Sequence, residues 1–545
     1  MMMSAGGAVT ILSVEPGSWR QKATVALVLG LLCWVDLLLM SALHVEGGAD
    51  IDTINFGLSA FRFDLTQHQP HPPGYLGYVL WLKFLHLVLP GLGPLAIAEW
   101  GSRLCGMLTI PASYWACRRL TDPSHPWRPL WAAALAATHP IMIKYGSDGQ
   151  SHAAEALCTL LLFGACVVIA RRSTYARRML FVVAFAAAGS VRPNIPLLSV
   201  PMLLWVLWRR PRGEWLLALV LGTITTLLWA VPLVLLSGGW TIYQRATTAL
   251  LTDFFGASYS VFGARAGWTM VATNVNLALV SGLVACIPLL AWSRGEGAWR
   301  RVFWGTVAIN VLFYATFYCA ESGYLIGVAS LACLTPAAWP VLLRRALRLR
   351  IGMAIATGPL FFFLAPAYVP SVTSAGLELP SFSHAVAADS FQGAFRRLVC
   401  EAAGGQASLA LSNHPRLAPH RSVPLLCPNV IFATWFGGLK FNPQVDSLIV
   451  ASDQGQVALP TGIPLESGSG VDHRLARPVE RIMVAPDASR GFIEMIARQA
   501  SCPRLWEAER TLGEDRVLVW PARCFSRLQI GKNALLLTPR KEASP

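Results

Sequence analysis

The sequence predicts a mainly α-helical, polytopic membrane protein, with a helical bundle followed by a small C-terminal α/β domain. Three observations predict this fold class. The 545 residues are 54% hydrophobic and only 13% charged, whereas soluble domains carry about 25% charged residues. Apolar runs long enough to cross a bilayer recur through the first two thirds of the chain. After about residue 371 the hydropathy falls, and short strand-like runs replace the apolar ones.

Apolar runs of about 20 residues are the length that a transmembrane helix needs, and they indicate roughly eleven spans. The first run, about Ala23 to Leu43, is too long for a signal-peptide core and lacks a convincing cleavage site, so we expect an uncleaved anchor. Two of the runs, 178–192 and 194–209, are short and predict a tight hairpin or a kinked, partly re-entrant unit. The expected spans are 22–44, 96–117, 129–145, 152–170, 178–192, 194–209, 214–236, 270–293, 302–319, 322–343 and 350–370.

Basic residues gather in every second loop, while the alternate loops carry only scattered ones. Because Lys and Arg are retained on the cytoplasmic side, this bias predicts a cytoplasmic N-terminus and an outer C-terminal domain. The formal net charge of +15 therefore reflects membrane orientation, and no basic stripe with interleaved aromatics indicates nucleic-acid binding. The basic loops contain Arg20, Lys22, Arg118, Arg119, Arg128, Arg171, Arg172, Arg177, Arg178, Arg209, Arg210, Arg212, Arg294, Arg300, Arg301, Arg344, Arg345, Arg348 and Arg350.

Two domains follow from this pattern. Residues 1–371 form the membrane domain, with long outer loops at 45–95 and 237–269, and residues 372–545 form the outer α/β domain. In that outer domain we expect strands at 409–411, 430–434, 447–451, 481–484 and 516–520, with a helix at 492–500. Its four cysteines, in an oxidising compartment, allow two disulfides with three connectivities: Cys400, Cys427, Cys502 and Cys524.

The first outer loop has an unusual polar density. Asp50 and Asp52 flank one residue, so an extended backbone points them the same way. A carboxylate at a membrane interface is partly desolvated, which raises its pKa and suits it to act as a base. His71 precedes two prolines and so lies on a rigid segment. The alternative interpretation is a solvated acidic loop without chemistry.

The same loop predicts two amphipathic helices that lie along the membrane surface, over 52–63 and 75–89. In the first of them Ile54, Leu58 and Phe61 recur at helical spacing.

These residues resemble the first loop of protein O-mannosyltransferases and related membrane glycosyltransferases of the GT-C fold. That family pattern is an acidic pair, a short spacer, Phe-Gly and a downstream His-Pro-Pro. The loop is also similar to that of bacterial mannosyltransferase-like proteins with a Pro-His-Pro-Pro-Gly-Tyr run. The matching run covers about residues 50–78 and consists of Asp52-Thr53-Ile54-Asn55-Phe56-Gly57, then Phe63-Asp64, then His71-Pro72-Pro73-Gly74.

The resemblance implies a GT-C-like bundle in the bacterial inner membrane, with its C-terminal domain periplasmic or extracellular. It implies transfer of a mannose-like sugar from a polyprenyl-phosphate donor to a hydroxyl on a lipid, glycan or protein. Asp52 matches the family's general base. The next residue departs from the family, because Thr53 stands where the pattern has Glu, which leaves the acceptor class and the second carboxylate open. Asp50 is one candidate to compensate.

A second, shorter outer loop supplies further candidates. Asp148 is our choice for a second catalytic acid, and His152 and Glu155 start the following span, where ionisable residues are functional candidates. The alternative is a polar turn that caps the helix from His152. Lys144 in the same loop is a weaker candidate for binding the donor.

Arg192, at the outer junction of two spans, is expected to hold the donor phosphate or else to reach lipid headgroups. His71 and Tyr75 complete the predicted substrate-binding set.

No cofactor is predicted with certainty. The leaving phosphate needs positive charge or a metal ion, so a divalent metal stays open and its ligands unknown. No glycine-rich nucleotide cradle is present, which fits a lipid-phosphate donor. The main alternative function is a transporter or flippase for a lipid-linked or anionic envelope precursor, although no internal repeat is visible. A third is a structural assembly factor of the envelope.

Overall fold

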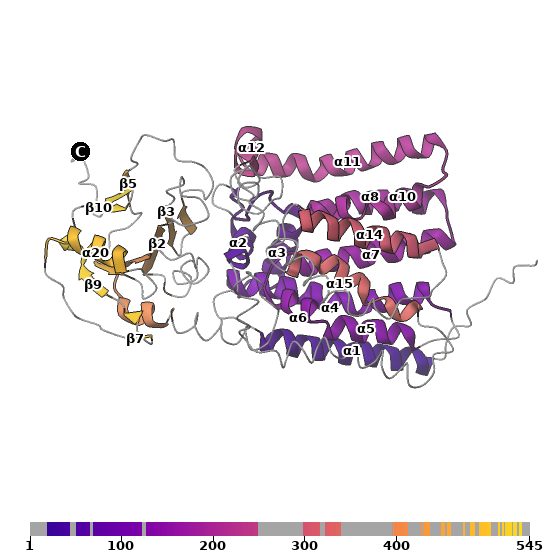
Figure 1. Cartoon of the computed structure of the whole chain (residues 1–545), viewed down its shortest axis with the longest axis horizontal. Helices are drawn as coiled ribbons and strands as arrows, with labels where there is room; N and C mark the ends of the chain where they lie inside the picture. The colour runs from indigo at the N-terminus through magenta and orange to yellow at the C-terminus, as the bar shows by residue number, and fades with distance from the viewer. Residues whose placement is uncertain are drawn as a thin grey trace, which may run out of the picture.

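The computed structural model of the chain separates a helical bundle from a C-terminal sheet (Figure 1). In the bundle it describes residues 19–43, 51–65, 69–122, 127–248, 298–316 and 322–338. In the C-terminal part it describes residues 395, 397–412, 427, 429–435, 448–452, 455–458, 472–474, 480–484, 490–502, 511–512, 515–516, 518–525, 527–530 and 533–536. The predicted spans 270–293 and 350–370, the domain boundary at 371 and 372, and Asp50 lie outside these ranges.

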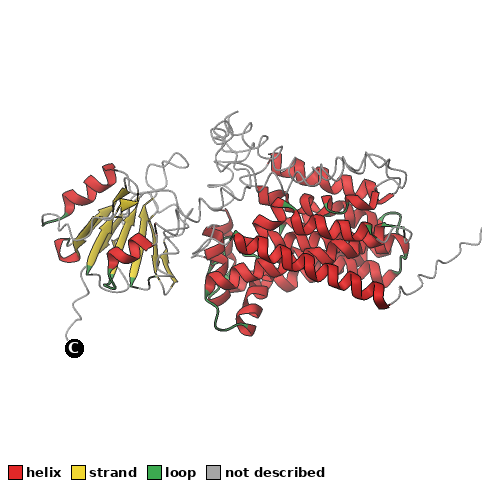
Figure 2. Ribbon diagram, turned by 90° about the horizontal axis from the view of Figure 1, so that it is seen from below, coloured by secondary structure: helices red, strands yellow, loops and turns green. Residues whose placement is uncertain are grey.

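The long helices of the bundle run side by side (Figures 1 and 2). Their bounds are α1 Trp19–Ala42, α4 Pro94–Leu120, α5 Arg128–Thr138, α6 Pro140–Ser147, α7 His152–Arg171, α8 Tyr175–Val191, α9 Asn194–Leu198, α10 Val200–Leu207, α11 Arg212–Leu236, α12 Trp240–Thr248, α14 Ala298–Thr316 and α15 Ile326–Ala332. Two short 3-10 turns, η4 Ser322–Leu325 and η5 Thr335–Ala338, flank α15. A cluster of buried apolar side chains from α4 to α15 forms the bundle core.

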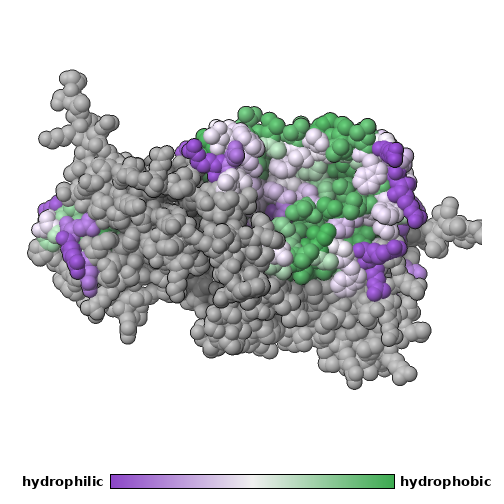
Figure 3. Space-filling view, turned by 45° about the horizontal axis from the view of Figure 1, so that its top comes forward, coloured by the Kyte–Doolittle hydropathy of each residue, from purple (hydrophilic) through white to green (hydrophobic). Residues whose placement is uncertain are grey.

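Three described helices are long and apolar enough to cross a membrane: 21–42 in α1, α7, and α11. The first and the last of these are mostly exposed, whereas α7 is mostly buried. A helix that presents Leu, Val and Ile outward needs lipid as its solvent. Figure 3 shows the corresponding apolar band, with hydrophilic residues at its right-hand edge. The chain is therefore an integral membrane protein.

Two of the predicted spans are each broken into two helices. The span at 129–145 stops at His139, whose backbone is extended at φ −73° and ψ 125°, and restarts at Pro140. The span at 194–209 is interrupted at Ser199, just before Pro201 in the first turn of α10. Proline disfavours the helical conformation in the residue before it and cannot donate a backbone hydrogen bond. The second break fits the kinked unit, which is one of the two alternatives predicted for 178–192 and 194–209.

The first outer loop contains the two predicted helices, α2 Ile51–Phe61 and α3 Leu76–Val88. They pack against each other and against α4, and α3 also contacts α8. The contact between α2 and α4 is too close for a side chain, because a Cβ on Gly57 would lie 2.4 Å from the backbone oxygen of Pro94. Both helices lie at the end of the bundle that is nearer the C-terminal sheet (Figure 1).

The C-terminal part is a mixed α/β domain. Its main sheet has the order β4-β3-β2-β1-β6-β9, in which β1 pairs in parallel with β2 and β6 while the outer pairs are antiparallel. The strands are β1 Ser408–Ser412, β2 Val430–Trp435, β3 Leu448–Ser452, β4 Gly455–Ala458, β6 Arg481–Val484 and β9 Leu518–Pro521. Smaller sheets hold β5 Asp472–Arg474, β7 Thr511–Leu512, β8 Asp515–Arg516, β10 Arg527–Ile530 and β11 Asn533–Leu536, and helix α20 spans Arg490–Gln499.

Two disulfides fix one of the three connectivities that the sequence left open: Cys400 pairs with Cys427, and Cys502 with Cys524. The first links a helical segment, 397–403, to the residues that precede β2. That segment packs Leu398 and Val399 onto Ala410 and Met483 of the central strands. The small α/β domain is thus as predicted.

Candidate active site

The first outer loop brings Asp52 and His71 together at the start of α2. The Asp52 Oδ1 lies 3.2 Å from the His71 Nδ1, and the side-chain amide of Asn55 donates to the same carboxylate oxygen at 3.4 Å. Asp52 keeps 32% of its side chain exposed. It is therefore the partly accessible member of the pair, while His71 is more enclosed. A carboxylate held by an imidazole and an amide has a fixed orientation.

His71 is in turn held by Tyr75, whose hydroxyl lies 3.1 Å from the His71 Nε2. The turn between them depends on Gly74, which has a φ of 111° that glycine adopts readily. The ring of the buried Phe56 meets His71, Tyr75 and Tyr78 edge to face, with centroids 5.0–5.4 Å apart. This packing fixes the relay from Asp52 through His71 to Tyr75.

Burial raises the pKa of Tyr75 to about 12, and the Arg192 guanidinium, by charge and by a hydrogen bond, opposes that rise. Tyr75 therefore stays protonated near neutral pH. Helix α3 begins directly after Tyr75 and contacts α8, so the loop lies against the helix that ends just before Arg192.

Arg192 is the centre of a buried polar group. Its Nη1 lies 3.0 Å from the Glu155 Oε2 and also contacts the His152 Nδ1, and its guanidinium lies over the Tyr324 ring at 5.3 Å. Arg192 and Glu155 are both almost fully buried. The guanidinium therefore neutralises a buried carboxylate, as an intramembrane charge requires. Both predicted roles of Arg192, holding the donor phosphate or reaching lipid headgroups, stay predictions.

Two residues that the sequence did not single out complete this group. The Asn194 side-chain amide donates to the Glu155 Oε1 at 3.4 Å and to the Tyr314 hydroxyl. Tyr314 also packs on Tyr324, with ring centroids 5.2 Å apart. Asn194 had a usable signal, because it follows Arg192-Pro193 directly at a helix start. Tyr314 lies in an apolar helix, so the sequence gave no signal for its role.

Thr53, the departure from the family pattern, has a structural role here. It is fully buried, and its hydroxyl donates to the backbone oxygen of Asp148. The Tyr78 hydroxyl donates to the neighbouring Gly149 oxygen at 3.2 Å. Together these bonds attach α2 and α3 to the turn between α6 and α7.

Asp148 is buried in that turn, where its Oδ1 accepts the backbone N–H of Gln150 at 3.0 Å. This is the contact expected of a residue that shapes a turn. This bond shapes the turn but does not cap α7, whose N-cap is Ser151, and a catalytic role for Asp148 stays a prediction.

Lys144 is partly buried beside Tyr145, with its Nζ 4.9 Å from the ring centroid and 3.4 Å from the hydroxyl. Tyr145 packs on His152 at 4.9 Å. Lys144 is thus connected to Arg192 through three contacts, by way of Tyr145 and His152.

Seven of the nine predicted site residues thereby connect into one region, with Asp148 at its back and Asp50 outside the described residues. Among the described residues, no group of three or more His, Cys, Asp or Glu side chains is arranged to hold a metal ion.

The chain is similar over most of its length to ArnT from Cupriavidus metallidurans. Alignment with the crystal structure of that protein bound to undecaprenyl phosphate gives a TM-score of 0.58, covers 92% of this chain and 98% of ArnT, and pairs residues that are 14% identical. The chain has a GT-C-like fold. The apo structure of ArnT gives the same values. The archaeal oligosaccharyltransferase AglB from Archaeoglobus fulgidus, solved with an inhibitory peptide and a dolichol-phosphate, aligns at a TM-score of 0.37 and 11% identity over 89% of this chain and 82% of AglB.

At the level of sequence, no protein-family model and no curated protein matches the chain. At 14% identity, the likeness to ArnT shows a shared fold, and the GT-C-like fold predicted from the first loop is confirmed.

Proposed function

We propose that this protein is a membrane glycosyltransferase that moves a sugar from a polyprenyl-phosphate donor to a hydroxyl acceptor. The observation that carries the proposal is the partly accessible Asp52 carboxylate, held by His71 and Tyr75, in a loop that packs against the helix ending at the buried Arg192. A base and a cation on adjoining elements suit a reaction that removes a proton and releases a phosphate. The GT-C-like fold and the undecaprenyl phosphate bound to ArnT support this donor class.

In the proposed reaction, Asp52 takes the proton of the acceptor hydroxyl as its oxygen forms a bond to the anomeric carbon. The bond from that carbon to the donor phosphate breaks, and the polyprenyl phosphate leaves with the electron pair. His71 holds the Asp52 carboxylate toward the acceptor. A single displacement of this kind inverts the anomeric configuration. The transfer assay described below compares mannosyl and glucosyl donors and so tests whether the sugar is mannose-like.

Arg192 would stabilise the leaving phosphate. A guanidinium carries five N–H donors, so Arg192 can keep Glu155 and Tyr75 and still donate to a phosphate oxygen. Glu155, His152 and Asn194 then serve to orient Arg192. We keep Lys144 as a second phosphate ligand and Asp148 as a second catalytic acid.

We also propose that this site faces the periplasm. The arginine-rich ends of α7 and α8 lie at the opposite ends of those helices from Glu155 and Arg192, which suits cytoplasmic arginines. The two disulfides in the C-terminal domain suit an oxidising compartment.

The test is Asp52→Asn in the full-length protein, reconstituted in liposomes with radiolabelled mannosyl- and glucosyl-undecaprenyl phosphate and an envelope extract as the source of acceptor. The readout is loss of label from the donor. We expect transfer to fall at least 100-fold, because a general base contributes about 10²–10⁴-fold.

Asp64→Asn is the matched control. Asp64 lies in the same loop, but its carboxylate pairs with the exposed Arg62 at 3.2 Å. This variant should transfer sugar at the wild-type rate. An Asp52→Asn protein that keeps its activity, or an Asp64→Asn protein that loses as much, would refute Asp52 as the base.

A further inference from the structure

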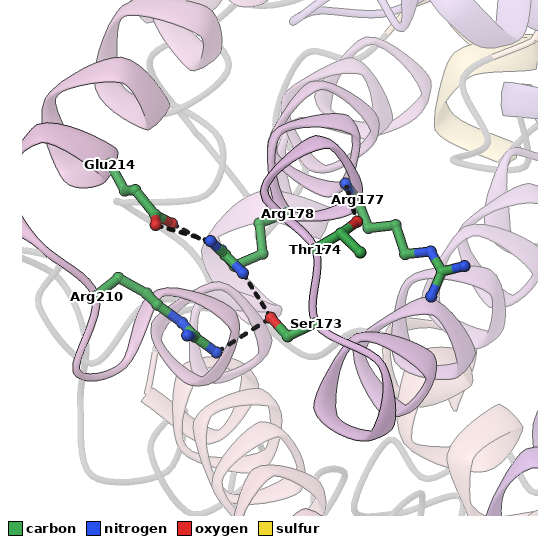
Figure 4. Close-up of polar contacts among 6 residues, drawn as sticks. All are labelled: Ser173, Thr174, Arg177, Arg178, Arg210 and Glu214. Carbon is green, nitrogen blue, oxygen red and sulfur yellow. Dashed lines mark hydrogen bonds and ion pairs between the residues drawn. The ribbon is translucent and has the colours of Figure 1, made fainter. Parts of the chain in front are cut away.

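An arginine cluster lies at the end of the bundle opposite to Arg192, where α7 and α10 end and α8 and α11 begin. It combines seven guanidinium groups with one carboxylate, Glu214 (Figure 4 labels part of it). The arginines are Arg171, Arg172, Arg177, Arg178, Arg209, Arg210 and Arg212. All of them except Arg178 are on the surface.

The cluster is organised around Ser173. The Ser173 Oγ accepts one hydrogen bond from the Arg178 Nη1 at 2.6 Å and another from the Arg210 Nη2 at 3.1 Å (Figure 4). Arg178 also grips both carboxylate oxygens of Glu214 at 2.7 Å. These bonds join the α7–α8 turn to the α10–α11 turn, so the positive charges are held in a defined arrangement.

The positive charge of this cluster exceeds what the protein itself neutralises. Among the described residues, the pair between Arg178 and Glu214 is the one ion pair in the cluster. Arg171, Arg172, Arg209 and Arg210 lie at helix C-terminal ends, where the helix dipole favours a cation. Arg177, Arg178 and Arg212 lie in the first turns of α8 and α11, where it disfavours one. A bound anion would neutralise the positive charge at the N-terminal ends of both α8 and α11.

Aromatic and apolar side chains beside the arginines indicate where that anion comes from. Tyr175, Trp208 and Trp215 expose 51%, 63% and 38% of their surface. Leu216 and Leu219, one turn further along α11, are also exposed. Aromatic rings of this kind lie at the headgroup level of a bilayer, next to acyl chains. A soluble polyanion would not use the apolar surface.

We infer that the arginine cluster around Ser173 binds the phosphate of an anionic phospholipid. The guanidinium groups hold the phosphate, and the exposed face of α11 contacts the acyl chains. Clusters of basic residues at a membrane surface attract anionic lipid headgroups. The inference does not depend on the proposed enzymatic activity.

The test uses the full-length protein in nanodiscs that contain equal amounts of phosphatidylglycerol and phosphatidylethanolamine. Lipids that stay bound after transfer to detergent are counted by native mass spectrometry. We expect the wild type to retain phosphatidylglycerol preferentially. Arg177→Gln with Arg210→Gln should lower its retention about 25-fold, since each basic residue contributes about fivefold. Inorganic phosphate at millimolar concentration should not displace the lipid, because it lacks the acyl chains.

The matched control is Arg118→Gln with Arg119→Gln, which removes two exposed arginines from the end of α4. It should retain phosphatidylglycerol within twofold of the wild type. Ser173→Ala, which removes no charge, should weaken retention severalfold. Equal losses in the two double variants would show that only general interfacial charge acts, and would overturn the inference. Equal retention of both lipids by the wild type, or displacement by phosphate, would also overturn it.

Discussion

The two ends of the α7–α8 hairpin carry opposite electrostatic arrangements. At one end Glu155 and Arg192 are buried and pair with each other at 3.0 Å. At the other end Arg171, Arg172 and Arg177 are exposed, and positive charge is in excess because Glu214 pairs with Arg178. A buried pair satisfies itself and fixes the geometry of its neighbours, whereas an exposed excess of one sign attracts something from outside. We therefore assign the proposed reaction to the end with Glu155 and Arg192, and lipid binding to the arginine end.

The largest expected effect comes from breaking the buried pair. Arg192→Gln leaves the Glu155 carboxylate buried without its cation, so we expect the free energy of unfolding in detergent to fall by about 3 kcal/mol. Chemical denaturation of the purified full-length protein would measure it.

The double variant, Arg192→Gln with Glu155→Gln, tests the cause. It removes both charges, so its loss should be smaller than the sum of the two single losses. Additive losses would contradict a direct interaction between the two side chains.

The tolerance for an added side chain should also differ between the two ends of the bundle. Gly57→Ala places a Cβ 2.4 Å from the backbone oxygen of Pro94 and must push α2, which carries Asp52, away from α4. Overpacking of this kind costs about 1–3 kcal/mol. Gly213→Ala, at the arginine end, meets nothing within 4 Å and should leave both stability and sugar transfer unchanged. Thermal unfolding of the two variants side by side measures the contrast, and equal losses would refute it.

The smallest effect on sugar transfer is expected at the arginine end. Glu214→Gln removes the carboxylate that pairs with the buried Arg178, at a cost of about 2 kcal/mol for a hydrogen-bonded charged pair. Because the cluster then has a larger positive excess, retention of phosphatidylglycerol should rise while sugar transfer stays constant. A fall in lipid retention would mean that Glu214 acts mainly by holding Arg178 in place.

Hydropathy and helical spacing were sufficient to predict the bundle and α2, because lipid-facing surface and a buried Ile54 are encoded locally. The breaks at His139 and Ser199 also had a local signal, the prolines at 140 and 201, and a kink was one of the two alternatives predicted for the second of them. Short edge strands such as β4 and β5 were missed, since three or four residues give little periodicity. The central strands were found because Leu409 and Ile482 belong to continuous apolar runs.

The site was predicted as a set of residues but not as a set of pairs. Asp52 and His71 share one loop, so their proximity follows from the sequence. Glu155 and Arg192 are 37 positions apart in two helices, and their pairing depends on how those helices pack. For the same reason the role of Thr53 was unreadable, because its acceptor is a backbone oxygen nearly a hundred residues away.

That bond has a consequence for mutational tolerance. Thr53 and Tyr78 both donate to main-chain oxygens, at positions 148 and 149, and every amino acid supplies such an oxygen. The docking of α2 and α3 therefore places no demand on the side chain at position 148. At position 149 the demand is strict, because Gly149 has a φ of 79° and a Cβ there would lie 2.7 Å from Thr53. Saturation mutagenesis of this turn should yield folded protein with glycine almost alone at 149. At 148 it should favour residues such as Asn that still accept the N–H of Gln150, so a loss of sugar transfer in folded Asp148→Asn protein would report on chemistry.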